Sequence, residues 1–205
     1  MSWWESIVRV TYSLTNQTFY GTGVFVGPQT VLTAAHNVWP EALGGRPAVE
    51  RLTVLTTAGP RSARGYRVHQ LWESMRDPSA DVAVIGISEN AATGLPVRLS
   101  TPGAPMVADA GLLGFGPSVS GAGFQSPTAE YQTGVVFQSR AQSGLDSLLS
   151  RDFFVKHGFS GAPFLARTPQ GVDVIGIATY ELETTGQYAH KGLPMLPANY
   201  SVLLT

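Results

Sequence analysis

Short apolar segments, separated by Gly, Pro, Asn and Ser, recur along the whole chain. Alternate positions in one such segment are occupied by Val8, Val10, Tyr12 and Leu14. A period of two predicts a β-strand with one buried face. Similar segments, alternating or rich in β-branched residues, span residues 23–26, 30–33, 51–57, 65–71, 81–87, 96–100, 110–115, 130–139, 147–155, 163–167 and 172–180. The 23 Gly and 14 Pro supply turn signals between them. The sequence therefore predicts an all-β fold with little helix, the one helical candidate being 199–204.

A Ser-Thr-Pro-Gly-Ala-Pro segment at residues 100–105 divides the 205 residues nearly in half. Two prolines and a glycine cannot continue a central strand, so this segment is predicted to be a linker. We expect a single domain, 1–205, built of an N-terminal lobe, 1–100, and a C-terminal lobe, 106–205. The Ser- and Gly-rich residues 117–128 are predicted to form an exposed loop.

Composition excludes several classes of function. A net charge of -1 provides no basic surface for nucleic acid or anionic membranes. The longest apolar runs, such as 82–87, are too short for membrane insertion. The chain has no cysteine, which excludes disulfides, thiolate metal sites and a cysteine nucleophile. His69, His157 and His190 show no metal-ligand spacing, so we expect no metal and no cofactor. Residues 1–14 lack a basic segment followed by a continuous apolar one, so no signal peptide is expected.

Two motifs carry candidate chemistry. Gly-Phe-Ser-Gly-Ala-Pro spans residues 158–163, and Thr-Ala-Ala-His spans residues 33–36. A serine hydroxyl is a weak nucleophile until an imidazole accepts its proton, and the imidazole needs a carboxylate to fix its tautomer. Ser160 is the candidate nucleophile, His36 the base and Asp81 the orienting carboxylate, because Asp81 opens an apolar strand. Asp77, which precedes a proline, fits a turn better.

A glycine two residues before the candidate nucleophile also has a chemical explanation. An oxyanion hole needs two backbone N–H groups that point at one position. Gly158 can adopt the dihedral angles that aim its N–H group beside that of Ser160. We therefore expect these two N–H groups to form an oxyanion hole.

These motifs, in the order His, Asp, Ser, resemble the chymotrypsin-like (trypsin-like) serine peptidases over nearly the whole chain. Residues 110–116 are similar to the family's strand that enters the second barrel, and residues 175–180 to the strand that pairs with substrate. The resemblance implies two antiparallel six-stranded β-barrels with the active site in the cleft between them. It also implies that Thr179 supports Asp81 and that the backbone of residues 179–181 binds peptide.

The departures from the family pattern are informative. Secreted members pair a cysteine after the histidine with one upstream, whereas Asn37 and Gly21 stand at those places here. This agrees with a reducing, cytoplasmic location. Phe159 stands where zymogens have the Asp that receives a new N-terminal amine, so activation by trimming is not expected. In both respects the chain resembles bacterial and viral members, including the HtrA-type and glutamyl endopeptidase groups.

The resemblance also indicates a substrate pocket. Phe154 stands where trypsin-like enzymes place an acidic residue, so a pocket with an Asp floor is not expected. Glu181 replaces a glycine of open-pocketed relatives, and it either narrows the pocket or offers a carboxylate to a basic side chain. His157 and His190 are candidates for the rim. The candidate substrate-binding residues are Phe154, Val155, His157, Thr179, Tyr180 and Glu181.

Two functions of different classes fit these observations. The first is a serine endopeptidase that hydrolyses protein or peptide substrates through an acyl-enzyme. The second is a latent or pseudo-protease scaffold, which acts as a peptide-binding module or as an effector activated by a regulatory protein partner. A self-cleaving polyprotein component is a related third reading. The fold alone does not separate them, because function depends on the site and its regulation.

Overall fold

The computed structural model describes most of the chain. The described residues are 3–15, 18–40, 43, 45–77, 80–88, 94, 96–100, 107–115, 118–120, 123–125, 129–140, 146–150, 153, 157–181 and 190–194. For residues 107–108, 118–120, 123–125, 137–140, 146–150, 180–181 and 190–194 the description covers the backbone alone.

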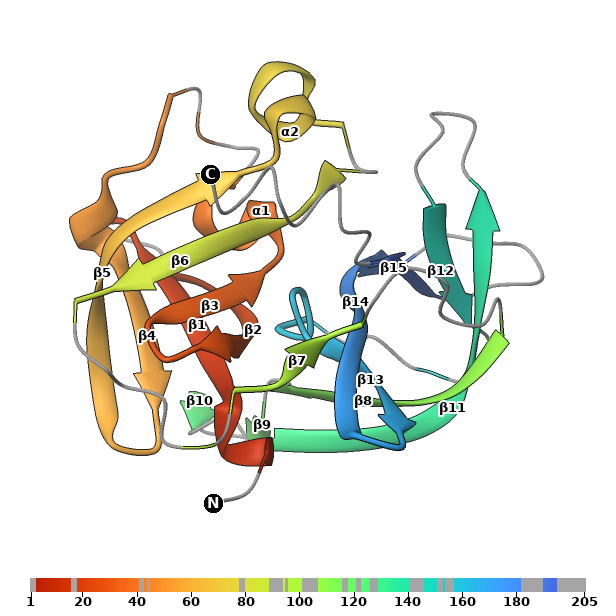
Figure 1. Ribbon diagram of the computed structural model, residues 1–205. Helices are drawn as coiled ribbons and strands as arrows, with labels where there is room; N and C mark the ends of the chain where they lie inside the picture. The colour runs from red at the N-terminus through yellow and green to blue at the C-terminus, as the bar shows by residue number, and fades with distance from the viewer. Residues whose placement is uncertain are drawn as a thin grey trace.

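Six antiparallel strands of the N-terminal half form a closed barrel, shown on the left of Figure 1. Around the barrel they follow the order β1 (Ile7–Ser13), β2 (Thr18–Gly27), β3 (Thr30–Thr33), β6 (Ala83–Ile87), β5 (Gly59–Val68) and β4 (Leu52–Thr56). The predicted all-β class and the predicted first six-stranded barrel are therefore confirmed.

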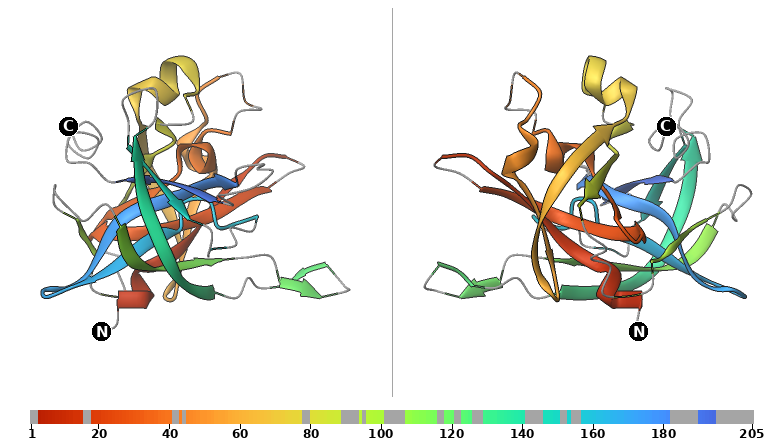
Figure 2. Two further views of the ribbon diagram at one scale, coloured as in Figure 1. Left: turned by 90° about the vertical axis from the view of Figure 1, so that its right-hand side faces the viewer. Right: turned by 60° about the vertical axis from the view of Figure 1, so that its left-hand side comes forward.

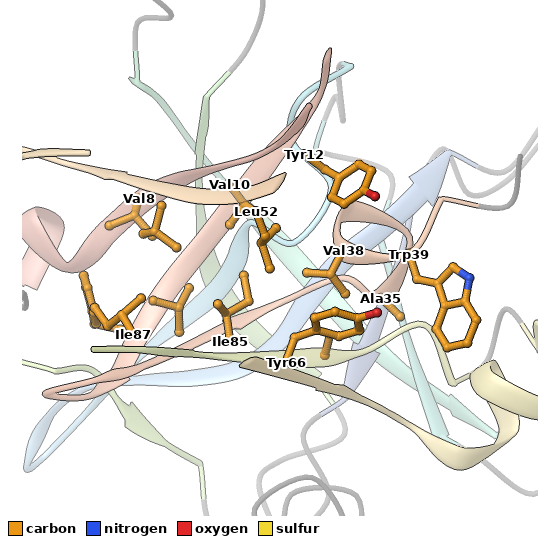
Figure 3. Close-up of a cluster of buried hydrophobic side chains, with 14 of the residues drawn as sticks. Val8, Val10, Tyr12, Ala35, Val38, Trp39, Leu52, Tyr66, Ile85 and Ile87 are labelled. Carbon is orange, nitrogen blue, oxygen red and sulfur yellow. The ribbon is translucent and has the colours of Figure 1, made fainter. Parts of the chain in front are cut away.

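The alternate apolar side chains of β1 point into this barrel and help to fill it. Val8 and Val10 are completely buried and Tyr12 nearly so, as the alternation predicts. Their side chains meet those of β6, where Ile85 and Ile87 are also fully buried. Figure 3 shows this cluster, with Tyr66 and Trp39 toward one end. The barrel is a packed core that holds without any disulfide, since the chain contains no cysteine.

Six strands of the C-terminal half and the short strand β7 form a seven-stranded sheet, on the right of Figure 1. Its order is β13 (Pro163–Thr168), β8 (Val107–Phe115), β11 (Ala129–Arg140), β12 (Asp146–Ser150), β15 (His190–Pro194), β14 (Gly171–Glu181) and β7 (Arg98–Leu99), with an additional pairing of β13 with β14. The seventh strand, β7, is parallel to β14. Closure of this lobe into a second six-stranded barrel stays a prediction.

The segment that contains β7 contacts both lobes. The Val97 N–H group donates to the carbonyl oxygen of Phe25 in β2 (2.9 Å), and the Ser100 N–H group donates to that of Val174 in β14 (2.8 Å). The Arg98 guanidinium donates to a carboxylate oxygen of Asp173, with Nη2 at 2.8 Å. Chain division at residues 100–105 stays a prediction, because residues 101–106 lie outside the described part.

Residues 118–125, predicted to be a loop, contain a small hairpin of β9 (Ser118–Ser120) and β10 (Gly123–Gln125). Figure 2 shows it projecting away from the larger sheet. The strands are short and flanked by the Gly and Ser residues that suggested a loop.

Within the described part of the chain, four short helical segments were not predicted: η1 (Trp3–Ser6), α1 (Ala35–Val38), η2 (Val49–Arg51) and α2 (Gln70–Met75). The strand predicted for 65–71 is wrong at its end, because β5 stops at Val68 and α2 follows. The Nδ1 atom of His69 accepts a hydrogen bond from the Leu71 N–H group (3.2 Å) and so caps the new helix. The helical candidate 199–204 lies outside the described residues.

Candidate active site

The pairing of β3 with β6 brings His36 and Asp81 together. Thr33, the last residue of β3, pairs with Ala83, the first residue of β6. The chain leaves β3 and enters β6 at the same end of this antiparallel pair. His36, in α1 just after β3, therefore lies beside Asp81, just before β6.

His36 and Asp81 are joined by two hydrogen bonds. One Asp81 carboxylate oxygen accepts from the His36 backbone N–H group (2.9 Å), and the other lies 2.6 Å from Nδ1 of the imidazole. The Asp81 side chain is 1% exposed and that of His36 is 29% exposed. An ionised carboxylate only accepts hydrogen bonds, so in the neutral imidazole this contact selects the tautomer with the proton on Nδ1 and the lone pair on Nε2.

Ser160 lies in the turn that precedes β13, drawn between the two lobes in Figure 1. Two glycines with positive φ shape the turn: Gly158 at 93° and Gly161 at 84°. A Cβ atom at Gly158 would overlap with the Phe115 carbonyl oxygen, and one at Gly161 with the Thr22 carbonyl oxygen. Only glycine fits both the dihedral angles and the space.

The first lobe holds this turn through hydrogen bonds that the sequence did not predict. The Ser160 carbonyl oxygen accepts from the Thr22 N–H group (2.8 Å) and from Nδ2 of Asn37 (2.6 Å). The Thr22 hydroxyl donates to the Gly158 carbonyl oxygen (2.8 Å) and accepts from the Phe115 N–H group (3.0 Å). Thr22 and Asn37 are thus contact residues of the candidate site, and both are buried.

The described contact of the Ser160 hydroxyl is with Thr179 of β14, whose carbonyl oxygen lies 3.4 Å away. Thr179 is 2% exposed and lies at a register shift between β14 and β15. A bulge of this kind redirects the backbone locally. Support of Asp81 by Thr179 stays a prediction.

The predicted substrate-binding residues are described unequally. His157 is exposed, and its ring packs edge-on against Tyr20, with centroids 5.1 Å apart. Tyr180 and Glu181 belong to β14, but the description of them is limited to the backbone. Phe154 and Val155 lie outside the described residues. His190 begins β15 and is the register partner of Glu181 in β14.

Helix α2 supplies a neighbour of His36 that the sequence did not reveal. The Trp72 ring is tilted by 48° to the His36 ring, with centroids 6.4 Å apart, and it is 1% exposed. The Arg76 guanidinium lies 4.0 Å from the centroid of the Trp39 ring and 5.7 Å from that of Trp72. A buried indole beside the imidazole limits the movement of the His36 ring.

The helix that carries Trp72 depends on a buried histidine. Burial lowers the pKa of His69, and the nearby Asp77 charge opposes this shift. The neutral ring suits its contact, because Nδ1 must keep a lone pair to accept from Leu71. His69 is therefore a helix cap.

Over the described ranges, no three His, Asp or Glu side chains gather to hold a metal ion. Among the helices of these same ranges, none is long and apolar enough to cross a membrane.

The comparisons with known proteins address the family and the fold of the chain. Residues 21–177 match the family model of the trypsin-like peptidase domain. Because the match covers most of the chain, the protein belongs to this family of serine peptidases and their relatives. No curated protein matches the sequence.

Solved structures with the same fold share little sequence with this chain. A Glu endopeptidase is 16% identical with a TM-score of 0.74, over 98% of this chain and 89% of that one. Protease Anisep from Arthrobacter nicotinovorans is 15% identical with a TM-score of 0.74, over 98% and 96%. An inactivated protease paralogue from the scabies mite is 14% identical with a TM-score of 0.68, over 94% and 90%. At this identity the structures show the chymotrypsin-like fold, which both active and inactivated proteins adopt.

Proposed function

We propose that the protein is a serine endopeptidase in which Ser160, His36 and Asp81 form a catalytic triad. The observation that carries the proposal is the paired hydrogen bonding of His36 to the buried Asp81 carboxylate. This contact fixes both the position and the tautomer of the imidazole. It occurs in a chain of the trypsin-like peptidase family, with a serine in the expected glycine-rich turn.

In the proposed reaction, Nε2 of His36 takes the Ser160 hydroxyl proton as Oγ attacks the scissile carbonyl carbon. The tetrahedral intermediate collapses when His36 passes this proton to the leaving amine, which gives an acyl-enzyme and releases the first product. Water, deprotonated by His36, then attacks the ester, and the acid product leaves as Ser160 regains a proton. Asp81 stabilises the imidazolium at both stages and stays ionised.

The backbone N–H groups of Gly158 and Ser160 form the proposed oxyanion hole. Each such donor contributes about 3–4 kcal/mol to stabilising the transition state. The positive φ of Gly158 and the anchoring of its carbonyl oxygen by Thr22 support this role, because together they fix the peptide groups on either side of Gly158. A preorganised donor needs no rearrangement during the reaction.

Protein or peptide substrate is proposed to bind beside β14, along the backbone of residues 179–181. Phe154, Val155, His157, Tyr180 and Glu181 are the proposed lining of the specificity pocket. A Glu endopeptidase has the same fold. For this chain the two readings of Glu181 predict different cleavage preferences. A pocket narrowed by Glu181 would favour small side chains, whereas a Glu181 carboxylate inside the pocket would favour basic ones.

One observation favours a second candidate, the latent scaffold. The Ser160 hydroxyl lies within hydrogen-bonding distance of the Thr179 carbonyl oxygen, so its proton has a partner other than a base. An inactivated protease has the same fold. In this second proposal a regulatory partner or a bound peptide turns the hydroxyl toward His36.

Hydrolysis of an unfolded protein and of a mixed peptide library, read by mass spectrometry, separates the two candidates. The wild-type protein is expected to cleave, and Ser160→Ala and His36→Ala are each expected to be slower by about 10⁴-fold or more while remaining folded. Ser13→Ala, at the exposed end of β1, is the matched control and is expected to cleave normally. Cleavage that survives in Ser160→Ala would reject the assignment.

A further inference from the structure

Gly21 in β2 and Asn37 in α1 lie against each other beneath the candidate site. Asn37 is 4% exposed. A Cβ atom placed on Gly21 would overlap with the Asn37 carboxamide. The absence of a side chain at Gly21 therefore makes the room in which this amide lies.

The Asn37 side-chain amide has two hydrogen-bond partners, and in this arrangement both act as acceptors. Its Nδ2 atom donates to the Ser160 carbonyl oxygen (2.6 Å) and to Oγ1 of Thr33 (2.9 Å). Thr33 already uses its hydroxyl proton to donate to the Thr22 carbonyl oxygen (2.6 Å). Both N–H bonds of the amide are thus required, which settles which end of the carboxamide faces Ser160.

This contact fixes the peptide group that follows the serine. The carbonyl side of the Ser160–Gly161 peptide accepts from Asn37 and from the Thr22 N–H group, so the first lobe occupies both of its lone pairs. The N–H side of the same peptide donates to the Ala178 carbonyl oxygen of β14 (2.6 Å). The peptide is therefore held from both lobes, and Asn37 is the residue directly after His36.

We propose that Asn37 is a positioning residue, which keeps the Ser160 main chain in place relative to His36 through the serine carbonyl oxygen, with Gly21 as its required neighbour. The proposal rests on the proposed function for its catalytic consequence. Because Asn37 and His36 are consecutive residues of one short helix, any shift of the Ser160 backbone away from Asn37 changes the distance between nucleophile and base. A misplacement of about 1 Å costs on the order of 100-fold in rate.

Asn37→Asp tests the contact with almost no change of shape. A carboxylate would set an acceptor against the Ser160 carbonyl oxygen, so that hydrogen bond is lost. Thr33 could then bind residue 37 only by turning its hydroxyl proton away from the Thr22 carbonyl oxygen. With a fluorophosphonate probe we expect the maximal rate of covalent labelling to fall by about 10- to 100-fold, while the probe concentration at half-maximal rate is unchanged. Gly21→Ala, which displaces the amide without altering it, should have the same effect.

Tyr66→Phe is the matched control, because it also removes a buried hydrogen bond in the first lobe, from the Tyr66 hydroxyl to the Pro47 carbonyl oxygen (3.0 Å). It is expected to label at the wild-type rate. Folded Asn37→Asp and Gly21→Ala proteins that label within about twofold of this control would overturn the proposal. Failure of both variants to fold, with the control folded, would make the contact structural and would also overturn it.

A second readout keeps this test separate from the proposed function. Failure of the wild-type protein to label would contradict the proposed peptidase activity without addressing Asn37. Hydrogen exchange of the Thr22 amide, which donates to the Ser160 carbonyl oxygen, then decides the positioning role. Faster exchange in Asn37→Asp than in Tyr66→Phe supports it, and equal exchange overturns it.

Discussion

The Thr22 hydroxyl joins the first lobe to the turn that contains Ser160 and to β8, and its removal should lower the stability of the protein. Thr22→Val replaces the hydroxyl by a methyl group of similar size, so no cavity forms. The Gly158 carbonyl oxygen loses its donor at 2.8 Å, and the Phe115 N–H group loses its acceptor at 3.0 Å. Two main-chain groups that were paired are left without these partners.

The magnitude follows from the burial of those two groups. An unsatisfied buried polar group costs about 1–3 kcal/mol, and a partly buried one costs less. The Gly158 carbonyl is buried and the Phe115 amide is partly buried, so we expect a loss of about 2–4 kcal/mol in the free energy of unfolding. For a protein of this size the melting temperature should fall by about 5–15 °C.

Thermal and urea unfolding, followed by circular dichroism, measure this loss. Thr22→Ser keeps the hydroxyl and removes one methyl group, so it should lose only about 1 kcal/mol. We also expect slower labelling by a fluorophosphonate in Thr22→Val, since Gly158 carries a proposed oxyanion donor. A Thr22→Val protein as stable as Thr22→Ser would refute the reasoning.

Two further perturbations test the turn and the helix cap. Gly161→Ala should be destabilised by at least about 3 kcal/mol, since a Cβ atom there overlaps with backbone, whereas Gly59→Ala, also at positive φ (108°) but in open space, should lose only about 1–2 kcal/mol; equal losses in urea titrations would show that the overlap is relieved. For His69, burial lowers the pKa in the folded protein below its ordinary value of 6.5. The unfolded chain then binds more protons as the pH falls through 6.5, so stability should decrease from pH 7.5 to pH 5.5 by this contribution. His69→Asn keeps an acceptor at the helix N-terminus and does not titrate, so its stability should depend less steeply on pH; an unchanged slope would exclude His69 as the cause.

Local sequence patterns were sufficient to predict those parts of the structure that depend on residues close together in the chain. The alternation of Val8, Val10 and Tyr12 predicted which side of β1 is buried. The turn after strand 30–33 suggested His36 as the base, and the apolar run that follows Asp81 suggested Asp81 as its partner. The antiparallel pairing of β3 with β6 explains why the two residues meet.

The contacts that could not be predicted from the sequence join residues far apart in the chain or involve a residue type that is unusual for its role. Asn37 and Ser160 are 123 positions apart, and no local pattern relates them. The resemblance did indicate that Asn37 and Gly21 share a location, but not that the amide binds the serine carbonyl. Helix α2 was missed because Tyr66 and Val68 continue a strand pattern and because its cap is a histidine, which is not among the usual capping residues.

The most direct test of the proposed active site is the intact mass of the wild-type protein after incubation with a fluorophosphonate, beside that of Ser160→Ala. Capture requires a nucleophile, a base and an oxyanion hole that are assembled, but little knowledge of the substrate. We predict one adduct on the wild-type protein and none on Ser160→Ala. A folded wild-type protein that forms no adduct, or an adduct that persists in Ser160→Ala, would contradict the proposed site.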